Sequence, residues 1–166
     1  SVQGTADGIR RRGQGVAGNL AGRGGWVIAM KSYPQITQIS TDLVEEEKDP
    51  QTYAVIGAAM EVHRELGKGF SERIYHLAII KELERQRIPF KTEVEIPIFY
   101  KQQRLDCNYR IDLVCLDSIV VELKAHEGLG PSDTSQIINY LKASGLRRGL
   151  LLNFGKSSLQ YKRVVL

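Results

Sequence analysis

The sequence predicts an α/β domain in which a mixed β-sheet carries α-helices on its faces. Segments with helical spacing of apolar residues come first, at residues 52–67 and 71–86, and strand-like apolar runs follow them. A strand, a helix and a second strand then succeed one another between residues 121 and 152. Such a connection joins two parallel strands of one sheet. The length of 166 residues suits one domain with a sizeable core.

The N-terminal part differs in composition from the rest. Eight of the sixteen glycines lie within residues 1–25. Such a segment buries too little apolar area to offset the entropy lost on ordering. We therefore expect residues 1–30 to form a flexible Gly/Arg-rich extension, with Met30 as the native start. Residues 31–50 are expected to form a polar lead-in, and residues 51–166 the folded domain.

Two helices are predicted at the start of the domain. In the first, residues 52–67, apolar side chains recur at helical spacing and Gly67 provides a natural end. In the second, residues 71–86, Ser71 is expected to be the N-cap, and an apolar stripe is expected to face the core. The stripe consists of Ile74, Leu77, Ala78 and Leu83.

Five strands are predicted after these helices. Pro97 indicates that the first lies at an edge or contains a bulge, because proline cannot donate to a β-ladder. A tight turn near Asp117 and Ser118 joins the second strand to the third. A helix over residues 134–144, ended by Gly145, separates the third strand from the fourth. The strands are expected at residues 94–101, 108–116, 118–125, 147–155 and 161–166.

Composition narrows the class of protein. The net charge is +4, of which residues 1–30 supply +3, so any contact of the domain with nucleic acid must come from a local patch. Cys107 and Cys115 lack the spacing of a zinc site, and no disulfide is needed between them. We expect two reduced, buried thiols in a cytoplasmic protein. No apolar run approaches the ~20 residues that a bilayer requires, so no membrane association is expected.

Charged residues interrupt the apolar strand sequence IVVELKA, residues 119–125. Glu122 and Lys124 are two apart and therefore share one face of the strand. Across the predicted turn, Asp112 falls within about one residue of the position opposite Glu122, and such cross-strand neighbours lie roughly 5 to 8 Å apart. Two carboxylates and an ammonium group thus converge on one patch of the sheet.

This arrangement suits a hard divalent cation. Mg²⁺ commonly takes one or two carboxylates together with waters and substrate phosphate. It would relieve the repulsion between Asp112 and Glu122, polarise a phosphodiester and lower the pKa of a bound water. Lys124 would stabilise the developing negative charge. The alternative is that Glu122 and Lys124 form a structural ion pair on a partly exposed strand.

Two further patterns lie on the predicted helices. Gly69, Glu72 and Tyr75 form a G-x-x-E-x-x-Y pattern, in which the last two residues share a helical face. A glutamate at the start of a helix is also an ordinary partner of the helix dipole, so this pattern alone leaves both readings open. Gln136 and Tyr140 are four apart on the later helix, where the alternative is an unspecialised polar edge.

In combination these segments resemble the GxxExxY family within the PD-(D/E)xK nuclease superfamily, over about residues 50–160. The matching motifs, in the family's order, are EVHRELGKGFSERIY, YRIDLV, VELKA, QIINYLKASG and GLLLNFG. The resemblance implies a restriction-endonuclease-like fold, a mixed β-sheet flanked by α-helices with the active site on the central hairpin. It also implies a nuclease that depends on Mg²⁺ or Mn²⁺.

The same resemblance implies the site residues. Lys124 matches the catalytic lysine, and Gln136 and Tyr140 look like the extra motif of the RecB and lambda-exonuclease branch, which orients the site and the DNA backbone. Ile111 stands where the superfamily signature has proline, a departure that is common there. The matching metal-ligating positions are Asp112, Glu122, Leu123 and Glu72.

Three functions remain open at this point. The first is a metal-dependent nuclease that hydrolyses DNA, RNA being the other candidate substrate, and the complete set of acids with the lysine favours it. The second is a non-catalytic module of the same fold that binds nucleic acid or a protein partner, which the low charge of the domain favours. The third is a structural homo-oligomer that forms a larger assembly.

Overall fold

The computed structural model describes residues 49–166, so the predicted flexible extension and nearly all of the polar lead-in lie outside the described residues. The predicted mixed α/β architecture is confirmed, with five strands in one sheet and three helices among residues 49–166. No helix in this described part is long and apolar enough to span a membrane. The elements are α1 (Pro50–Leu66), α2 (Glu72–Arg85), β1 (Phe90–Tyr100), β2 (Gln103–Cys115), β3 (Ile119–Lys124), α3 (Pro131–Ser144), β4 (Arg148–Asn153) and β5 (Gln160–Val165).

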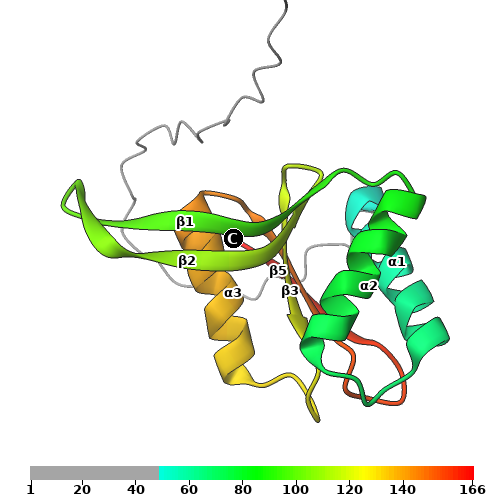
Figure 1. Cartoon of the computed structure of the whole chain (residues 1–166). Coiled ribbons are helices and arrows are strands. Elements are labelled where there is room, and N and C mark those ends of the chain that lie inside the picture. Colours follow the sequence, from blue (N-terminus) through cyan, green and yellow to red (C-terminus); the bar gives the residue numbers. More distant parts are fainter. Residues whose placement is uncertain (1–48) are drawn as a thin grey trace, which may run out of the picture. The chain divides into compact units, whose positions relative to one another are not determined.

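The strand order in the sheet is β1-β2-β3-β4-β5. Neighbouring strands are antiparallel except β3 and β4, which run parallel with Val121 opposite Leu150. The helix α3 makes the crossover between these two strands (Figure 1), as the strand–helix–strand pattern predicts. The edge strand β1 shifts its register against β2 between Pro97 and Phe99, which agrees with the edge position and bulge that Pro97 indicates.

The helices divide between the two faces of the sheet (Figure 1). Helices α1 and α2 pack on the face that carries Val121 and Leu123 of β3, and α3 packs on the opposite face against Val120. Because side chains alternate along a strand, Glu122 and Lys124 share the face of Val120, toward α3. The two apolar cores therefore enclose β3 and leave its two charges on the side of α3.

The β1–β2 hairpin is longer than the sequence predicts. Strand β1 begins at Phe90 rather than at residue 94, and β2 begins at Gln103 rather than at residue 108. Most of the additional residues are exposed on both faces, so they lack the apolar alternation that indicates a half-buried strand. This polar hairpin projects beyond the other strands (Figure 1).

The turn between β2 and β3 lies at Leu116 and Asp117, one residue earlier than predicted. Both residues have positive φ, 53° and 52°, and the Ser118 N–H donates to the Cys115 carbonyl at 3.1 Å. Two successive left-handed residues make a type I′ turn, whose twist matches that of the flanking strands. The turn fixes the register of the hairpin that carries the charged residues.

The predicted apolar stripe of α2 is partly wrong. Ile74 and Leu77 are 40% and 50% exposed, although they were expected to face the core. Leu83 is buried as predicted, and Tyr75 and Ile79 form the rest of the buried face of α2. The helix is therefore rotated so that the aromatic ring of the G-x-x-E-x-x-Y pattern, and not Ile74, enters the core.

Other differences are small. Cys107, expected to be buried, is exposed on the projecting hairpin, whereas Cys115 is buried, and both thiols are free. Helix α3 begins at Pro131, three residues earlier than predicted, and α1 begins at Pro50. Proline suits the first helical position because the N–H that it lacks would have no intrahelical partner.

Gly69 and Tyr75 shape the loop between α1 and α2. Gly69 has a φ of 109°, a conformation that glycine adopts readily and other residues rarely. The Tyr75 hydroxyl donates to the main-chain oxygen of Gly67 at 2.7 Å, and the Phe70 N–H donates to that hydroxyl at 3.3 Å. The closed loop places Glu72 at the first position of α2.

Asp49 ties the start of α1 to two strands from the other end of the domain. Its carboxylate accepts hydrogen bonds from the main-chain nitrogen and the hydroxyl of Thr52, at 3.1 and 2.6 Å. Arg148 of β4 and Arg163 of β5 contact the same carboxylate at 2.9 and 3.1 Å. Burial alone would raise the pKa of Asp49, but the bonds from Thr52 and the charge of Arg148 lower it to about 2.

We expect Asp49→Ala to lower the free energy of unfolding by about 3 kcal/mol, because it removes a helix cap and leaves two guanidinium groups without their buried partner. Since the lowered pKa keeps Asp49 ionised above about pH 4, the loss should be full at neutral pH and shrink as the pH falls toward 2. Urea unfolding measures it. The control is Glu84→Ala, which breaks an exposed pair with Lys81 and should cost less than about 0.5 kcal/mol. Equal losses would contradict the role of Asp49.

Candidate active site

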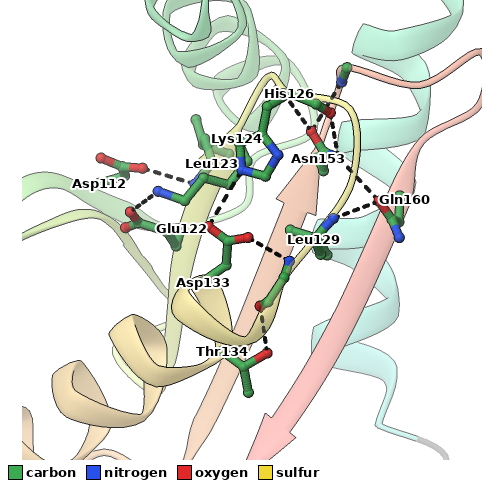
Figure 2. Close-up of polar contacts among 12 residues, drawn as sticks. Asp112, Glu122, Leu123, Lys124, His126, Leu129, Asp133, Thr134, Asn153 and Gln160 are labelled. Atoms are coloured by element: carbon green, nitrogen blue, oxygen red, sulfur yellow. Dashed lines mark hydrogen bonds and ion pairs between the residues drawn. The ribbon is translucent and has the colours of Figure 1, made fainter.

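The β2–β3 hairpin brings Asp112 to Glu122. Its ladder ends with Leu113 opposite Val121, so the next position in the same register sets Asp112 opposite Glu122. The Asp112 Oδ2 accepts a hydrogen bond from the main-chain N–H of Leu123 at 2.9 Å (Figure 2). A side chain thus continues the hairpin where its backbone pairing stops, and the Asp112 carboxylate is held against β3.

An irregularity in β2 accompanies this contact. Ile111 packs in the core on the α3 side, whereas Leu113 packs on the side of α1 and α2, so strict alternation is interrupted at Asp112. On β1, Glu93 lies opposite this point and has a φ of 49°. Both β1 and β2 are therefore irregular at the position of Asp112.

Glu122 and Lys124 form a buried pair on β3. The Lys124 Nζ donates to the Glu122 Oε1 at 2.7 Å, and their side chains are 13% and 5% exposed. The second carboxylate oxygen of Glu122, Oε2, has no hydrogen-bond partner. It is the one buried side-chain oxygen or nitrogen among residues 49–166 of which this is true. Because buried polar atoms are almost always paired in folded proteins, Oε2 marks a position for a ligand or a proton.

The electrostatics of this pair reflect its burial. Burial raises the pKa of Glu122 to about 7, the charge of Asp112 adds to this rise, and Lys124 opposes it. Burial would lower the pKa of Lys124, but its hydrogen bond to Glu122 and the nearby carboxylates raise that pKa above its ordinary value. Lys124 is therefore cationic at neutral pH, while Glu122 is poised between its two protonation states.

Glu72 approaches the hairpin from the first position of α2. Burial raises the pKa of Glu72, the charge of Lys124 opposes this rise, and the charge of Asp112 adds to it. Glu72 therefore lies within electrostatic reach of the hairpin. However, no group of three or more His, Cys, Asp or Glu side chains among residues 49–166 is placed to hold a metal ion. The metal-binding role predicted for Glu72 stays a prediction.

Gln136 and Tyr140 meet on α3. The Gln136 Nε2 donates to the Tyr140 hydroxyl at 2.7 Å, and the buried Tyr140 ring lies 5.3 Å from the ring of Tyr109 on β2. Burial raises the pKa of Tyr140, the hydrogen bond from Gln136 opposes this rise, and the charge of Glu122 adds to it. Both residues of the Q-x-x-x-Y pattern thus belong to the same polar neighbourhood as Glu122.

Three polar residues beside the site were missed by the sequence analysis. The His76 Nε2 lies 3.4 Å from the main-chain oxygen of Asp112. The His126 Nε2 lies 3.4 Å from the Asp133 Oδ1 (Figure 2). His126 continues the every-second-residue spacing of the charged positions on β3, and that spacing is the signal that could have identified it. Nothing in the local sequence marks His76 or Asp133.

The donor set suits a hard divalent cation. Asp112 and Glu122 offer carboxylate oxygens, and Leu123 offers its main-chain oxygen. Mg²⁺ binds oxygen ligands and commonly uses one or two carboxylates, with waters completing its octahedron, and Mn²⁺ accepts the same ligands. The unpartnered Glu122 Oε2 tests this fit, because a buried anionic oxygen without a hydrogen bond requires a cation or a proton nearby. The residues present therefore fit the metal that the resemblance implies.

Comparison with known proteins gives one family match. Residues 49–164 match a family model described as the PD-(D/E)XK nuclease superfamily. Among solved structures, the crystal structure of SSO0001 is 23% identical in sequence with a TM-score of 0.46, and the match covers 56% of this chain. It covers 48% of the SSO0001 chain, about half of its length. No curated protein matches this sequence.

We expect the metal-free protein to lose stability as the pH rises from about 5 to about 7. An unfolded glutamate ionises near its ordinary value of 4.5, whereas folded Glu122 ionises near 7, so the folded state binds the additional proton in this window. The loss should reach on the order of 2 to 3 kcal/mol and then level off at higher pH. Urea unfolding in chelator at a series of pH values measures it. Glu122→Gln keeps an oxygen for Lys124 and has no carboxyl proton to lose, so its free energy of unfolding should depend less on pH. If its pH dependence is parallel to that of the wild type, a residue other than Glu122 causes the effect.

Two substitutions at Asp112 should have opposite effects in chelator at pH 8. Asp112→Asn keeps an oxygen for the Leu123 N–H and removes a negative charge facing Glu122, so it should stabilise the metal-free protein by about 1 kcal/mol. Asp112→Ala leaves that N–H without a partner and should destabilise by about 1 to 3 kcal/mol. Thermal unfolding of both variants compares them. A structural role for the charge predicts instead that Asp112→Asn is neutral or destabilising.

Proposed function

The chain belongs to the PD-(D/E)XK nuclease superfamily, and from this premise we propose that it hydrolyses phosphodiester bonds of DNA with the help of Mg²⁺ or Mn²⁺. The observation that carries the proposal is the buried Glu122 carboxylate, which has Lys124 on one oxygen and no hydrogen-bond partner on the other. A purely structural pair would bury one anion with one cation and leave no acceptor unsatisfied. Asp112 adds a second carboxylate, whose charge acts on Glu122 and raises its pKa further than burial alone does.

Asp112, Glu122 and the main-chain oxygen of Leu123 would hold the cation, with Glu72 completing the site from α2. When bound, such a cation polarises the phosphodiester and lowers the pKa of a water molecule. Asp112 and Glu122 are prevented from separating by the hairpin, because Asp112 is bonded to the Leu123 N–H at 2.9 Å. The chain thus provides a preorganised pair of acids rather than one that must be assembled on binding.

Lys124 is the residue that we assign to the transition state. Its ammonium group is largely buried and remains charged at neutral pH, since the surrounding carboxylates raise its pKa. The Lys124 Nζ has three donors and uses one on Glu122, so the others could reach the attacking water or the phosphate. A preorganised cation in a partly dry site stabilises developing negative charge more strongly than it would in water.

We further assign the chain to the GxxExxY family and to the RecB and lambda-exonuclease-like branch of the superfamily. The hydrogen-bonded Gln136–Tyr140 pair on α3 supports this finer assignment, because it lies beside Glu122 as an orienting motif requires. DNA is the proposed substrate, RNA is a second substrate to be compared in the same assay, and the compartment proposed is the cytoplasm. A non-catalytic binding module or a homo-oligomeric assembly of the same fold is the outcome if cleavage is absent.

Lys124→Ala should lower the turnover of DNA cleavage by about 10²-fold or more, because it removes stabilisation that acts in the transition state. The cation should still raise the melting temperature of this variant, since Asp112 and Glu122 remain. Cleavage of linear and circular DNA, single-stranded and double-stranded, is measured in Mg²⁺ beside thermal unfolding in Mg²⁺ and in chelator.

Lys81→Ala is the matched control, because it removes an exposed lysine paired with Glu84 on α2 and should leave turnover unchanged. The wild-type protein decides the proposal itself. A melting temperature that does not respond to Mg²⁺, together with no cleavage of DNA or RNA, would replace the nuclease with the binding module.

A further inference from the structure

Side chains at the end of β4 and the start of β5 bind the backbone of the segment that follows β3. Asn153, fully buried at the end of β4, accepts a hydrogen bond from the His126 N–H at 3.1 Å and donates to the His126 carbonyl at 2.9 Å (Figure 2). Gln160 of β5 accepts from the Asn153 side chain at 3.1 Å and from the Leu129 N–H at 3.2 Å. The buried side-chain amide of Asn153 thus bonds both the main-chain N–H and the carbonyl of His126, which is itself exposed.

Gly155 adds a steric constraint on the same residue. A Cβ atom at position 155 would lie 2.6 Å from the main-chain nitrogen and carbonyl carbon of His126, and nearer still to its carbonyl oxygen. No side chain fits at such separations without displacing the His126 backbone. The Gly155 N–H also donates to the Asn153 side chain at 3.1 Å. Asn153 and Gly155, at and just beyond the end of β4, therefore both constrain the position of the His126 backbone.

The His126 ring is held from a second direction. Asp133 of α3 is buried, accepts a hydrogen bond from the Gly130 N–H at 2.8 Å and contacts the His126 Nε2 at 3.4 Å. Burial would raise the pKa of Asp133, but the Gly130 bond and His126 bring that pKa below its ordinary value, so Asp133 is an anion. Because Asp133 contacts Nε2, Nδ1 is the ring nitrogen left for a ligand, and the side chain is 44% exposed.

This ring adjoins the proposed site. The charge of His126 opposes the rise that burial causes in the pKa of Glu72, and the charge of Lys124 acts on Asp133, so the four side chains share one electrostatic neighbourhood. His126 also lies just beyond the carboxyl end of β3, beside the end of its parallel neighbour β4. Ligands of open α/β sheets commonly bind at the carboxyl ends of such strands.

Resting on the proposed nuclease function, we infer that His126 binds a phosphate group of the DNA substrate through its Nδ1, and that Asn153, Gly155 and Asp133 position it for this contact. An exposed histidine does not need contacts with Asn153, Gly155 and Asp133 in order to be stable on the surface. A phosphate ligand explains all three, because the imidazolium form of His126 carries an Nδ1–H beside the Nε2–H that faces Asp133, and such a donor must be aimed to bind an oxyanion well. Asp133 occupies one ring nitrogen and leaves the other for the phosphate.

The test is DNA binding measured by fluorescence anisotropy, with a labelled DNA duplex, Ca²⁺ in place of Mg²⁺, and a series of salt concentrations at one fixed pH. His126→Ala should weaken binding about tenfold at low salt, the loss of one charge-assisted hydrogen bond. It should also reduce the slope of log affinity against log salt by about 0.9, as expected for one lost phosphate contact. His126→Gln retains an N–H donor and should recover part of the affinity.

Gly155→Ala tests the positioning role. It should weaken binding as His126→Ala does, and the double variant should be no weaker than either single variant, because both remove the same contact. Additive losses would show that Gly155 acts independently of His126. Glu127→Gln, in the same loop and exposed, is the control and should bind within about twofold of the wild type.

Two results would overturn the inference. If His126→Ala binds DNA with wild-type affinity and salt slope, then His126 makes no phosphate contact. If it binds more weakly with an unchanged salt slope, the substitution has only a structural effect. Either result can occur while the wild type still cleaves DNA in Mg²⁺, and then the proposed function stands without this contact. A wild type that neither binds nor cleaves DNA rejects the proposed function instead.

Discussion

A carboxylate buried on a central strand is the constraint around which this domain is arranged. Glu122 lies on β3 between β2 and β4 and is only 3% exposed, so its charge is poorly solvated. Lys124 neutralises one of its oxygens at 2.7 Å, but the other is left without a hydrogen bond. A buried pair of this kind adds little to stability on its own. Its position in the middle of an otherwise apolar strand agrees with the metal-binding role that we propose for Glu122.

The fold supplies the remaining groups of the proposed site from three different directions. The β2–β3 hairpin provides Asp112, the first turn of α2 provides Glu72, and α3 provides the Gln136–Tyr140 pair. Each direction is fixed by something other than the charges themselves: a type I′ turn, the closed loop around Tyr75, and the crossover from β3 to β4. The site is therefore built on rigid elements, which is the condition for holding like charges close together.

Much of this could be predicted from the sequence. The period-two spacing of Glu122 and Lys124, and the strand–helix–strand order, follow from backbone geometry that any chain obeys. The polar half of the β1–β2 hairpin could not be predicted, because exposed strands carry no alternation. Ile74 was misplaced because a helix with apolar residues on several sides does not reveal which side meets the sheet. The contacts of His126 depend on tertiary packing between residues far apart in the chain.

The ion pairs of Asp49 have a consequence for how the domain forms. Its partner Arg148 is 99 residues away, and Arg163 is farther still. The first helix therefore obtains its full set of contacts only after nearly all of the domain has been synthesised. Until then α1 and the β1–β2 hairpin expose apolar side chains. Incompletely folded chains with exposed apolar surface are prone to aggregate, which is one reason that cells contain chaperones. A topology closed by such distant contacts also folds slowly, since long loops must be ordered before those contacts form.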